Sequence, residues 1–336
     1  MRQDKKVQNS SSARLMLESG LSTSVAEPHL TIAVCAYRHS DYIEECLRSI
    51  NDSMVTSIEL LVIDDGSPDD TFEKCLKFPY REGIAVRVYT KTNKGLVDSL
   101  RLGLSLARGT YFAAMASDDF YERGGLEAAL SLLEKESRPI DALLCQARTV
   151  GLVDRMVYGL DMERLFEKNA FSRLEKVWTA PPSPMLLQAT VFNTHFLRSL
   201  HPWEDSLELD DWPTFIRVFA AEAQLSANIK YASSVQLCRY RVHAQGIHAQ
   251  LDRHLRVTEQ VAATLVPPRY RRTCQGNVRI KIGLALLYEG CWRKGLATFF
   301  LGFKTNPSPI VIWHLFHRAA RFFVSRLMGR KSNSRS

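Results

Sequence analysis

Two pairs of adjacent carboxylates follow apolar runs in this 336-residue chain. Asp64-Asp65 follows "IELLVI" and precedes Gly-Ser-Pro, and Asp118-Asp119 follows "TYFAAM" after two small residues. Neighbouring carboxylates repel each other, and burying them is costly unless a positive charge compensates. A divalent cation held by carboxylate oxygens and completed by substrate phosphates supplies that charge. The repeated arrangement predicts a site for Mg²⁺ or Mn²⁺, although one Asp-Asp-Gly alone also fits a simple turn.

Strands and helices alternate around these pairs. Apolar runs predict buried strands, and apolar residues at helical spacing predict the helices between them. The strands are expected at 30–34, 58–63, 86–89 and 110–115, and the helices at 43–50 and 95–109. This alternation predicts an α/β fold with a doubly wound, mostly parallel sheet. Ligands bind beyond the carboxyl ends of the strands in such sheets, so both acidic pairs are expected to face one crevice.

The turn after the first strand has no glycine-rich phosphate loop. It reads "CAYRHS", without the glycines of a dinucleotide-binding turn, and no G-x-x-x-x-G-K-S/T occurs in the chain. A nucleotide bound here would therefore be held by carboxylates and a metal ion instead of a glycine cradle.

Four segments in order resemble the inverting glycosyltransferases of family 2, which have the GT-A fold. They read "AYRHSDYIEECLRSI", "VIDDGSPDDT", "TNKGLVDSLRLGLSLARG" and "TYFAAMASDDF", and the resemblance is strongest over residues 29–125. It implies a Rossmann-like GT-A domain that uses Mn²⁺ or Mg²⁺. It also implies transfer of a sugar from a nucleoside diphosphate donor, usually a UDP-sugar, to a hydroxyl of a glycan or lipid-linked acceptor, as in the biosynthesis of surface polysaccharides such as lipopolysaccharide.

The resemblance implies roles for individual residues of this chain. Asp65 corresponds to the carboxylate that reads the base, Tyr37 lies in the loop that cups it, and the Asp118-Asp119 pair matches the D-x-D region, one carboxylate facing the ribose and the other the metal. Ala116 stands where the family commonly has the first Asp of that region. The residues implied for nucleotide-sugar binding are Ala36, Tyr37, Asp65, Lys94, Asp118 and His243, and those implied for the metal are Asp118 and Asp119.

The second half of the chain is expected to supply the general base. "LELDDWPTF" resembles a family segment in which the second acid of an acidic pair takes the proton of the acceptor hydroxyl, and that position is Asp211. The alternative is an acidic surface turn in which Asp211 caps a helix. "CRYRVHAQ" resembles a further family motif and includes Tyr240, Arg241 and His243. His243 would bind diphosphate or metal, and a purely structural histidine is the alternative.

Domain boundaries follow from composition. Residues 1–28 are predicted to be a flexible leader, 29–262 the catalytic domain and 263–336 a basic amphipathic helical extension. Residues 29–125 would form the nucleotide-binding half and residues 126–262 the acceptor half. Seven cysteines without C-x-x-C spacing favour a reducing cytosol over a disulfide framework.

The C-terminal segment is strongly basic. No Asp or Glu follows Glu289, whereas nine Lys and Arg do, and Ile312, Phe316 and Phe323 recur at helical spacing. A basic amphipathic helix predicts peripheral membrane contact, at the inner face of the cell membrane for a cytoplasmic enzyme. The alternative is a helix packed on the catalytic domain. Nucleic acid is not expected as a partner, because nothing resembles a recognition module.

Two other functions fit parts of the pattern. A sugar-nucleotide nucleotidyltransferase also uses carboxylates and Mg²⁺ in a doubly wound sheet, but it would need a glycine-rich basic loop after the first strand. A non-catalytic, transferase-like binding protein is motivated by Ala116 in place of an aspartate. Donor hydrolysis with and without Mn²⁺ separates an enzyme from such a binding protein.

Overall fold

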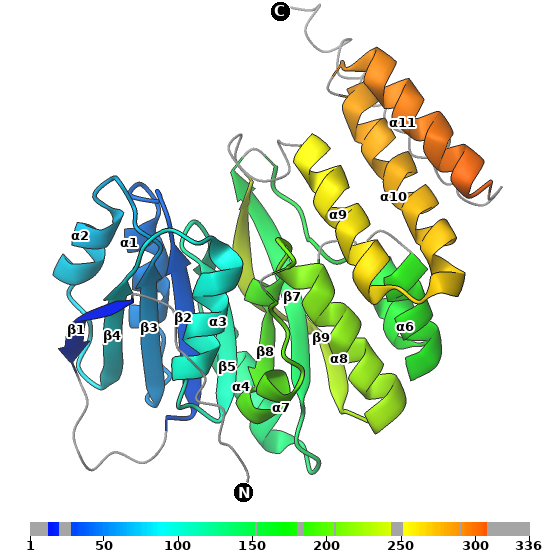
Figure 1. Cartoon of the computed structure of the whole chain (residues 1–336). Helices are drawn as coiled ribbons and strands as arrows, with labels where there is room; N and C mark the ends of the chain where they lie inside the picture. The colour runs from blue at the N-terminus through cyan, green and yellow to red at the C-terminus, as the bar shows by residue number, and fades with distance from the viewer. Residues whose placement is uncertain are drawn as a thin grey trace, which may run out of the picture. The chain divides into compact units, whose positions relative to one another are not determined.

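The computed structural model describes residues 13–19, 28–151, 153–179, 185–204, 206–242, 251–288 and 290–307. The chain forms two compact units. The first comprises residues up to Val177 together with Pro182–Ala249, and the second comprises Trp178–Pro181 with the residues from Gln250 onward. Among the described residues, the first unit contains the whole sheet, and the second is helical (Figure 1).

The described strands form one nine-stranded sheet in the order β1-β4-β3-β2-β5-β8-β7-β9-β6. The four strands β4, β3, β2 and β5 are parallel neighbours, and the remaining part of the sheet is mixed. The strands are β1 (Arg14–Ser19), β2 (Leu30–Ala36), β3 (Ile58–Asp64), β4 (Ile84–Thr90), β5 (Tyr111–Ala116), β6 (Phe120–Tyr121), β7 (Ala142–Gly151), β8 (Thr190–Asn193) and β9 (Ile229–Val242). The predicted α/β fold is confirmed, and every residue of β2 and β3 is buried.

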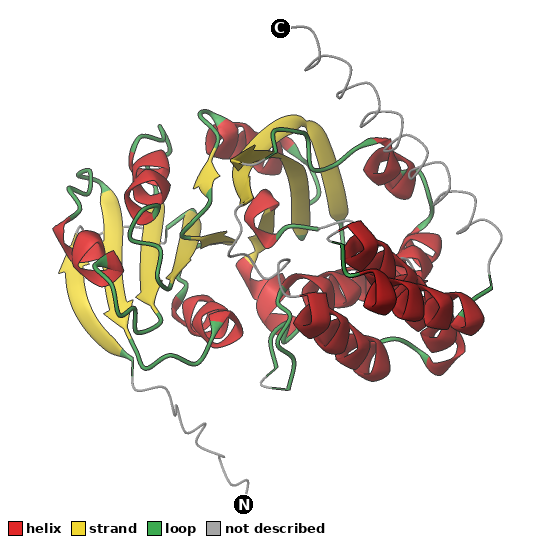
Figure 2. Cartoon of the chain, turned by 90° about the horizontal axis from the view of Figure 1, so that it is seen from above, coloured by secondary structure: helices red, strands yellow, loops and turns green. Residues whose placement is uncertain are grey.

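Helices cover both faces of this sheet (Figure 2). They are α1 (Ile43–Asn51), α2 (Thr71–Lys77), α3 (Leu96–Leu106), α4 (Gly125–Lys135), α5 (Leu160–Phe166), α6 (Ala170–Thr179), α7 (Thr194–Ser199) and α8 (Asp211–Leu225). Helix α1 buries the apolar positions that its sequence pattern indicated, from Ile43 to Ile50. Helix α3 packs close to the sheet, because a Cβ atom on Gly103 would lie 2.8 Å from the Cβ atom of Ala33 in β2. This packing places the first residues of α3 at the carboxyl edge of the parallel strands.

Two predicted boundaries differ from the structure. Residues 14–19, which the sequence placed in a flexible leader, form the edge strand β1 and pair antiparallel with β4. Most β1 side chains are exposed, so backbone pairing and not side-chain burial holds the strand, and an apolar pattern could not reveal it. The helical unit begins at Gln250 instead of 263, because α9 (Leu251–Leu265) belongs with the helices that follow it.

The second unit contains a tightly packed helical hairpin of α10 (Pro268–Tyr288) and α11 (Trp292–Thr305). A Cβ atom on Gly283 would lie 2.6 Å from the backbone nitrogen of Phe299, and one on Gly302 would lie 2.7 Å from that of Ile280. Only glycine permits such a close approach of two helix backbones. None of the described helices is long and apolar enough to cross a bilayer. The predicted amphipathic helix around 312–327 lies outside the described residues.

Candidate functional site

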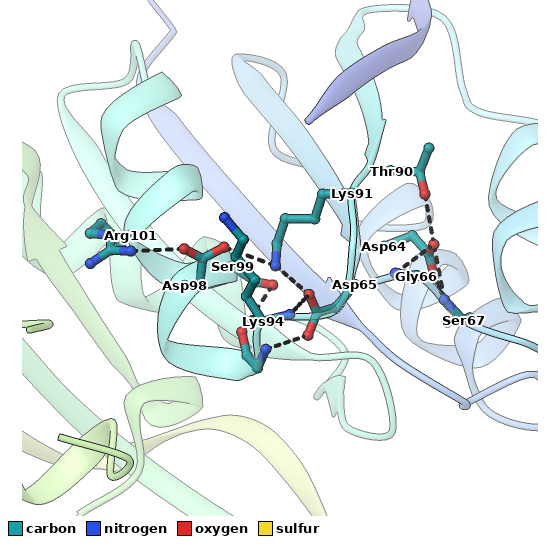
Figure 3. Close-up of polar contacts among 11 residues, drawn as sticks. Asp64, Asp65, Gly66, Ser67, Thr90, Lys91, Lys94, Asp98, Ser99 and Arg101 are labelled. Carbon is teal, nitrogen blue, oxygen red and sulfur yellow. Dashed lines mark hydrogen bonds and ion pairs between the residues drawn. The ribbon is translucent and has the colours of Figure 1, made fainter. Parts of the chain in front are cut away.

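The carboxylates of Asp64 and Asp65 point in different directions from the end of β3 (Figure 3). Asp64 Oδ2 accepts hydrogen bonds from the backbone N–H groups of Gly66 (3.1 Å) and Ser67 (3.2 Å) and from Thr90 Oγ1 (3.0 Å). The turn needs glycine, since Gly66 has a φ of +69° and its Cβ position lies 2.9 Å from the Lys91 carbonyl oxygen. The Asp64 carboxylate therefore stabilises the turn that follows β3, in agreement with the alternative that this Asp-Asp-Gly segment forms a simple turn.

Asp65 is held by the loop that precedes α3. Its carboxylate accepts hydrogen bonds from the N–H groups of Lys94 (2.9 Å) and Gly95 (2.7 Å) and forms an ion pair with Lys91. Lys91 is itself buried and also lies 2.9 Å from Asp98 Oδ2. Within this loop the protein supplies its own counter-charge. The expectation that a metal ion compensates both acidic pairs is therefore wrong for the Asp64-Asp65 pair.

Lys91→Met is expected to lower the free energy of unfolding by about 3–5 kcal/mol, because it leaves the largely buried carboxylates of Asp65 and Asp98 without the cation that they share. Urea denaturation measures this effect. Lys94→Met is the matched control, since the Lys94 side chain is exposed and only its backbone N–H contacts Asp65 in this network. Equal stability of the two variants would contradict the assigned role of Lys91.

Asp118 and Asp119, after β5, have different surroundings. Asp119 is 1% exposed, and its two oxygens accept hydrogen bonds from the backbone N–H of Arg241 (2.7 Å) and from Gln188 Nε2 (3.0 Å). Burial, followed by the charge of Asp118, raises the pKa of Asp119 well above its usual value. Asp118 is half-buried, and its Oδ1 lies 3.8 Å from His39 Nδ1. Asp119 thus connects β5 to later segments, while Asp118 is the more accessible carboxylate.

Arg241, in β9, fastens this acidic loop to the beginning of α1. Its Nε donates a hydrogen bond to the Asp118 carbonyl oxygen (2.8 Å), and its guanidinium forms an ion pair with Glu45 of α1. The guanidinium also lies 4.8 Å from the ring centroid of Tyr42. The sequence placed Arg241 in a motif without a structural role, because its partners in the acidic loop lie more than 100 residues earlier.

His39, in the turn after β2, is a residue that the sequence did not single out. Its Nδ1 lies 2.8 Å from Ser117 Oγ, so it contacts the residue immediately before the acidic pair. The only sequence signal was its place in "CAYRHS", which the pattern did not distinguish from an ordinary turn.

Acidic residues from both halves of the domain act on the pKa of one phenol. The pKa of Tyr240, in β9, is raised first by burial and then by the charges of four carboxylates: Asp119, Asp118, Asp211 and Asp210. The pKa of the Cys35 thiol, at the end of β2, is raised to about 12 by burial, with Lys91 lowering it and Asp210 and Asp65 adding to the rise. The beginning of α8 therefore lies beside the carboxyl ends of β2 and β5.

Asp211 is half-buried and is the first residue of α8. The N-cap position belongs to Asp210, whose side chain makes no capping hydrogen bond, and burial raises the pKa of Asp210. The alternative in which Asp211 caps the helix is therefore not what the structure shows.

The other predicted nucleotide-sugar residues lie along the same edge. Ala36 ends β2, and its carbonyl oxygen accepts a hydrogen bond from the Asp65 N–H (2.8 Å). Tyr37 follows with 39% of its surface exposed, and Lys94 contributes its N–H to Asp65. His243 lies outside the described residues.

A metal ion would find oxygen ligands here but no complete protein cage. The described part of the chain contains no group of three or more His, Cys, Asp or Glu side chains arranged to hold a metal. Mg²⁺-type ions are commonly bound by one or two carboxylates together with substrate phosphates. The accessible carboxylate of Asp118, in a site with excess negative charge, fits a cation of this kind.

The sequence of this domain matches the model of the family described as glycosyl transferase family 2 over residues 31–196. The chain carries a glycosyl transferase family 2 domain. Similar curated proteins include an uncharacterized glycosyltransferase of Haemophilus influenzae, 33% identical over 32% of this chain, and a chondroitin synthase of Escherichia coli, 33% identical over 38% of it. The matched segments span 33% and 18% of those two proteins, so this chain matches only a part of each.

Solved structures resemble the family 2 domain in fold. S. aureus TarS 1-349 in complex with UDP-GlcNAc has a TM-score of 0.54 at 18% identity and covers 82% of this chain and 81% of its own. The mannosyltransferase PcManGT from Pyrobaculum calidifontis in complex with GDP-Man and Mn²⁺ has a TM-score of 0.55 at 20% identity and covers 88% and 80%. The family 2 domain has the GT-A fold that the sequence predicted.

Proposed function

We propose that this chain is a metal-dependent inverting glycosyltransferase that moves a sugar from a nucleoside diphosphate, most simply UDP, to a hydroxyl of a glycan or lipid-linked acceptor. The observation that carries the proposal is the grouping of Asp118 and Asp211 around Tyr240. Such a transfer needs one carboxylate that binds the donor's metal ion and a second that accepts the proton of the acceptor hydroxyl.

The nucleobase would bind at Asp65 and Tyr37. The N–H groups of Lys94 and Gly95 orient the Asp65 carboxylate, and the lone pair of Oδ2 that they leave suits an N–H donor of a base such as uracil. The exposed ring of Tyr37 offers a face for stacking beside it. The TarS and PcManGT structures are complexes with UDP-GlcNAc and with GDP-Man, which supports a nucleotide-sugar donor for this chain.

The diphosphate would lie at the carboxyl end of β5. Asp118 would hold Mn²⁺ or Mg²⁺ there, and His243 and Lys94 are proposed as further contacts of the donor. The cation, when bound, neutralises charge that develops on the leaving diphosphate. Asp119, which is buried and hydrogen-bonded to Arg241 and Gln188, would keep the loop in place and serve the metal indirectly.

Asp211 would act as the general base. In an inverting transfer the acceptor hydroxyl attacks the anomeric carbon on the face opposite the leaving diphosphate, and a carboxylate takes its proton. Asp211 comes from α8 and Asp118 from the loop after β5, so the two carboxylates would approach the bound sugar from different elements.

A panel of nucleotide sugars tests this proposal, with nucleotide release and thermal shift measured in the presence of Mn²⁺. A bound donor is expected to raise the melting temperature, because it binds only the native state. Release of nucleoside diphosphate supports a glycosyltransferase. Release of pyrophosphate from a nucleoside triphosphate and a sugar phosphate would instead indicate a nucleotidyltransferase, and donor binding without turnover would indicate a binding protein.

A cytoplasmic location at the inner face of the cell membrane is part of the same proposal, since a lipid-linked acceptor would be met there. The basic C-terminal residues support it, because each Lys or Arg near an anionic surface contributes on the order of 1 kcal/mol. This contact is peripheral.

Truncation after Asn306 is expected to weaken binding to anionic vesicles while donor hydrolysis continues, because the acidic site lies wholly upstream. Co-sedimentation of full-length and truncated chains measures the difference. Equal binding of both would show that the segment beyond Asn306 does not hold the chain on the membrane.

A further inference from the structure

Helix α11 exposes a row of large apolar side chains. Four of them are among the most exposed hydrophobic residues of the described chain: Trp292 (63%), Leu296 (44%), Phe300 (59%) and Leu301 (51%). Trp292, Leu296 and Phe300 are spaced four residues apart and thus lie along one side of the helix. The buried glycines Gly295 and Gly302 face α10, so the hairpin is closed by its glycine side and presents its aromatic side outward.

Positive charge predominates in the helices of this unit. Helix α10 contains five Lys and Arg and no acidic residue, and α11 contains three more, Arg293, Lys294 and Lys304, also without an acidic residue. Arg293 and Lys304 are exposed on α11 itself, beside the apolar row. Lys294 pairs with Asp252 and Arg279 with Glu259, which are the acidic residues of the described helices α9 to α11, so a large excess of positive charge remains.

We propose that α11 lies flat on an anionic lipid surface, with Trp292, Leu296 and Phe300 in the headgroup region and Arg293 and Lys304 at the phosphates. Interfacial helices combine an aromatic and aliphatic face with basic residues, and tryptophan is enriched at this depth. The inference rests on the membrane location proposed above. It assigns a membrane contact to α11, in addition to the contact proposed for the segment after Asn306.

Lipid fits this surface better than a protein partner does. A bilayer interface accepts apolar side chains and phosphate-binding side chains from the same helix face, because acyl chains and headgroups lie within a few ångströms of each other. A second copy of this unit would instead bring its own basic residues against Arg293 and Lys304, and the like charges would repel.

The experiment uses the full chain and vesicles of phosphatidylcholine with and without phosphatidylglycerol. The double variant Trp292→Ser, Phe300→Ser is compared with Leu225→Ser, which changes an exposed leucine (77%) at the end of α8. The wild type and Leu225→Ser are expected to bind the anionic vesicles equally. The double variant is expected to bind them more than about tenfold more weakly, given the transfer free energy of two large apolar side chains.

Each other outcome overturns the assignment. Equal binding by the double variant would support the membrane location but contradict the role of α11 in it. Failure of the wild type to bind would contradict both the membrane location and the role of α11. A wild type that elutes as a dimer and a double variant that elutes as a monomer would show that a second copy covers the face. Sugar transfer to a soluble acceptor, assayed without vesicles, stays at the wild-type rate in the double variant, so the catalytic proposal is tested separately.

Discussion

Asp211→Asn is expected to lower the rate of sugar transfer by about 10²–10⁴-fold while leaving donor affinity unchanged. The amide has nearly the same shape as the carboxylate but cannot accept the proton of the acceptor hydroxyl. Asp211 is half-buried at the first position of α8, and its charge, like that of Asp118, acts on Tyr240, which supports its proposed role as the base.

Single-turnover transfer and titration of donor binding separate the two effects. Glu208→Gln is the matched control, because it makes the same chemical change at an exposed acid three residues earlier. The control is expected to retain wild-type transfer. Wild-type transfer by Asp211→Asn would show that another acid is the base, with Asp210 and Asp205 as the next residues to test and Glu208 already tested by the control.

Asp118→Asn is expected to abolish metal-dependent donor binding and to reduce turnover by roughly 10³-fold, which corresponds to several kcal/mol of lost charge stabilisation. Its thermal stability should stay close to that of the wild type, since Asp118 is half-buried and its removal relieves repulsion with Asp119. Calorimetric titration with Mn²⁺ and donor measures the first effect. Excess chelator should likewise stop the wild-type enzyme, and full activity in chelator would refute the metal requirement.

Asp119→Ala is expected to behave differently from Asp118→Asn. It too should stop turnover, but it removes the acceptor of the Arg241 N–H and of Gln188. A buried donor left without a partner costs about 1–3 kcal/mol, so this variant should also lose stability, in part offset by the relief of charge repulsion. Equal denaturation midpoints for the two variants would contradict the division of roles between the carboxylates.

The sequence predicted the parallel core of the sheet because its signals are local. Strands such as Leu30–Ala36 are continuously apolar, since helices cover them on both sides. The ends of β3 and β5 are marked by acidic residues because the strands leave the core there, at the edge where ligands bind in such sheets. The parallel sheet predicted that Asp65 and Asp118 share one edge, whereas adding Asp211 to the site rested on the family resemblance. The charges of Asp210 and Asp65 act on Cys35, and those of Asp118 and Asp211 act on Tyr240, which agrees with this grouping.

The features that the sequence missed depend on contacts between distant residues. Lys91 was not predicted as the counter-ion of Asp65, because nothing local distinguishes a buried lysine from an exposed one. Nor could the pattern show that Asp64 would be satisfied by Thr90 on the neighbouring strand. The division of roles between Asp118 and Asp119 required the position of Arg241, which comes from another part of the chain.

The Arg241 contact has a consequence for the order of folding. The Asp119–Arg241 hydrogen bond joins residues 122 positions apart, so the acidic loop cannot be completed until β9 has been synthesised and has paired with β6. Domains fold from the N-terminus during synthesis, and long-range pairings form late. A nascent chain that ends at residue 196, where the family match ends, already contains the Asp65 loop but neither Arg241 nor Asp211. Such an intermediate could recognise a nucleotide before it could transfer a sugar.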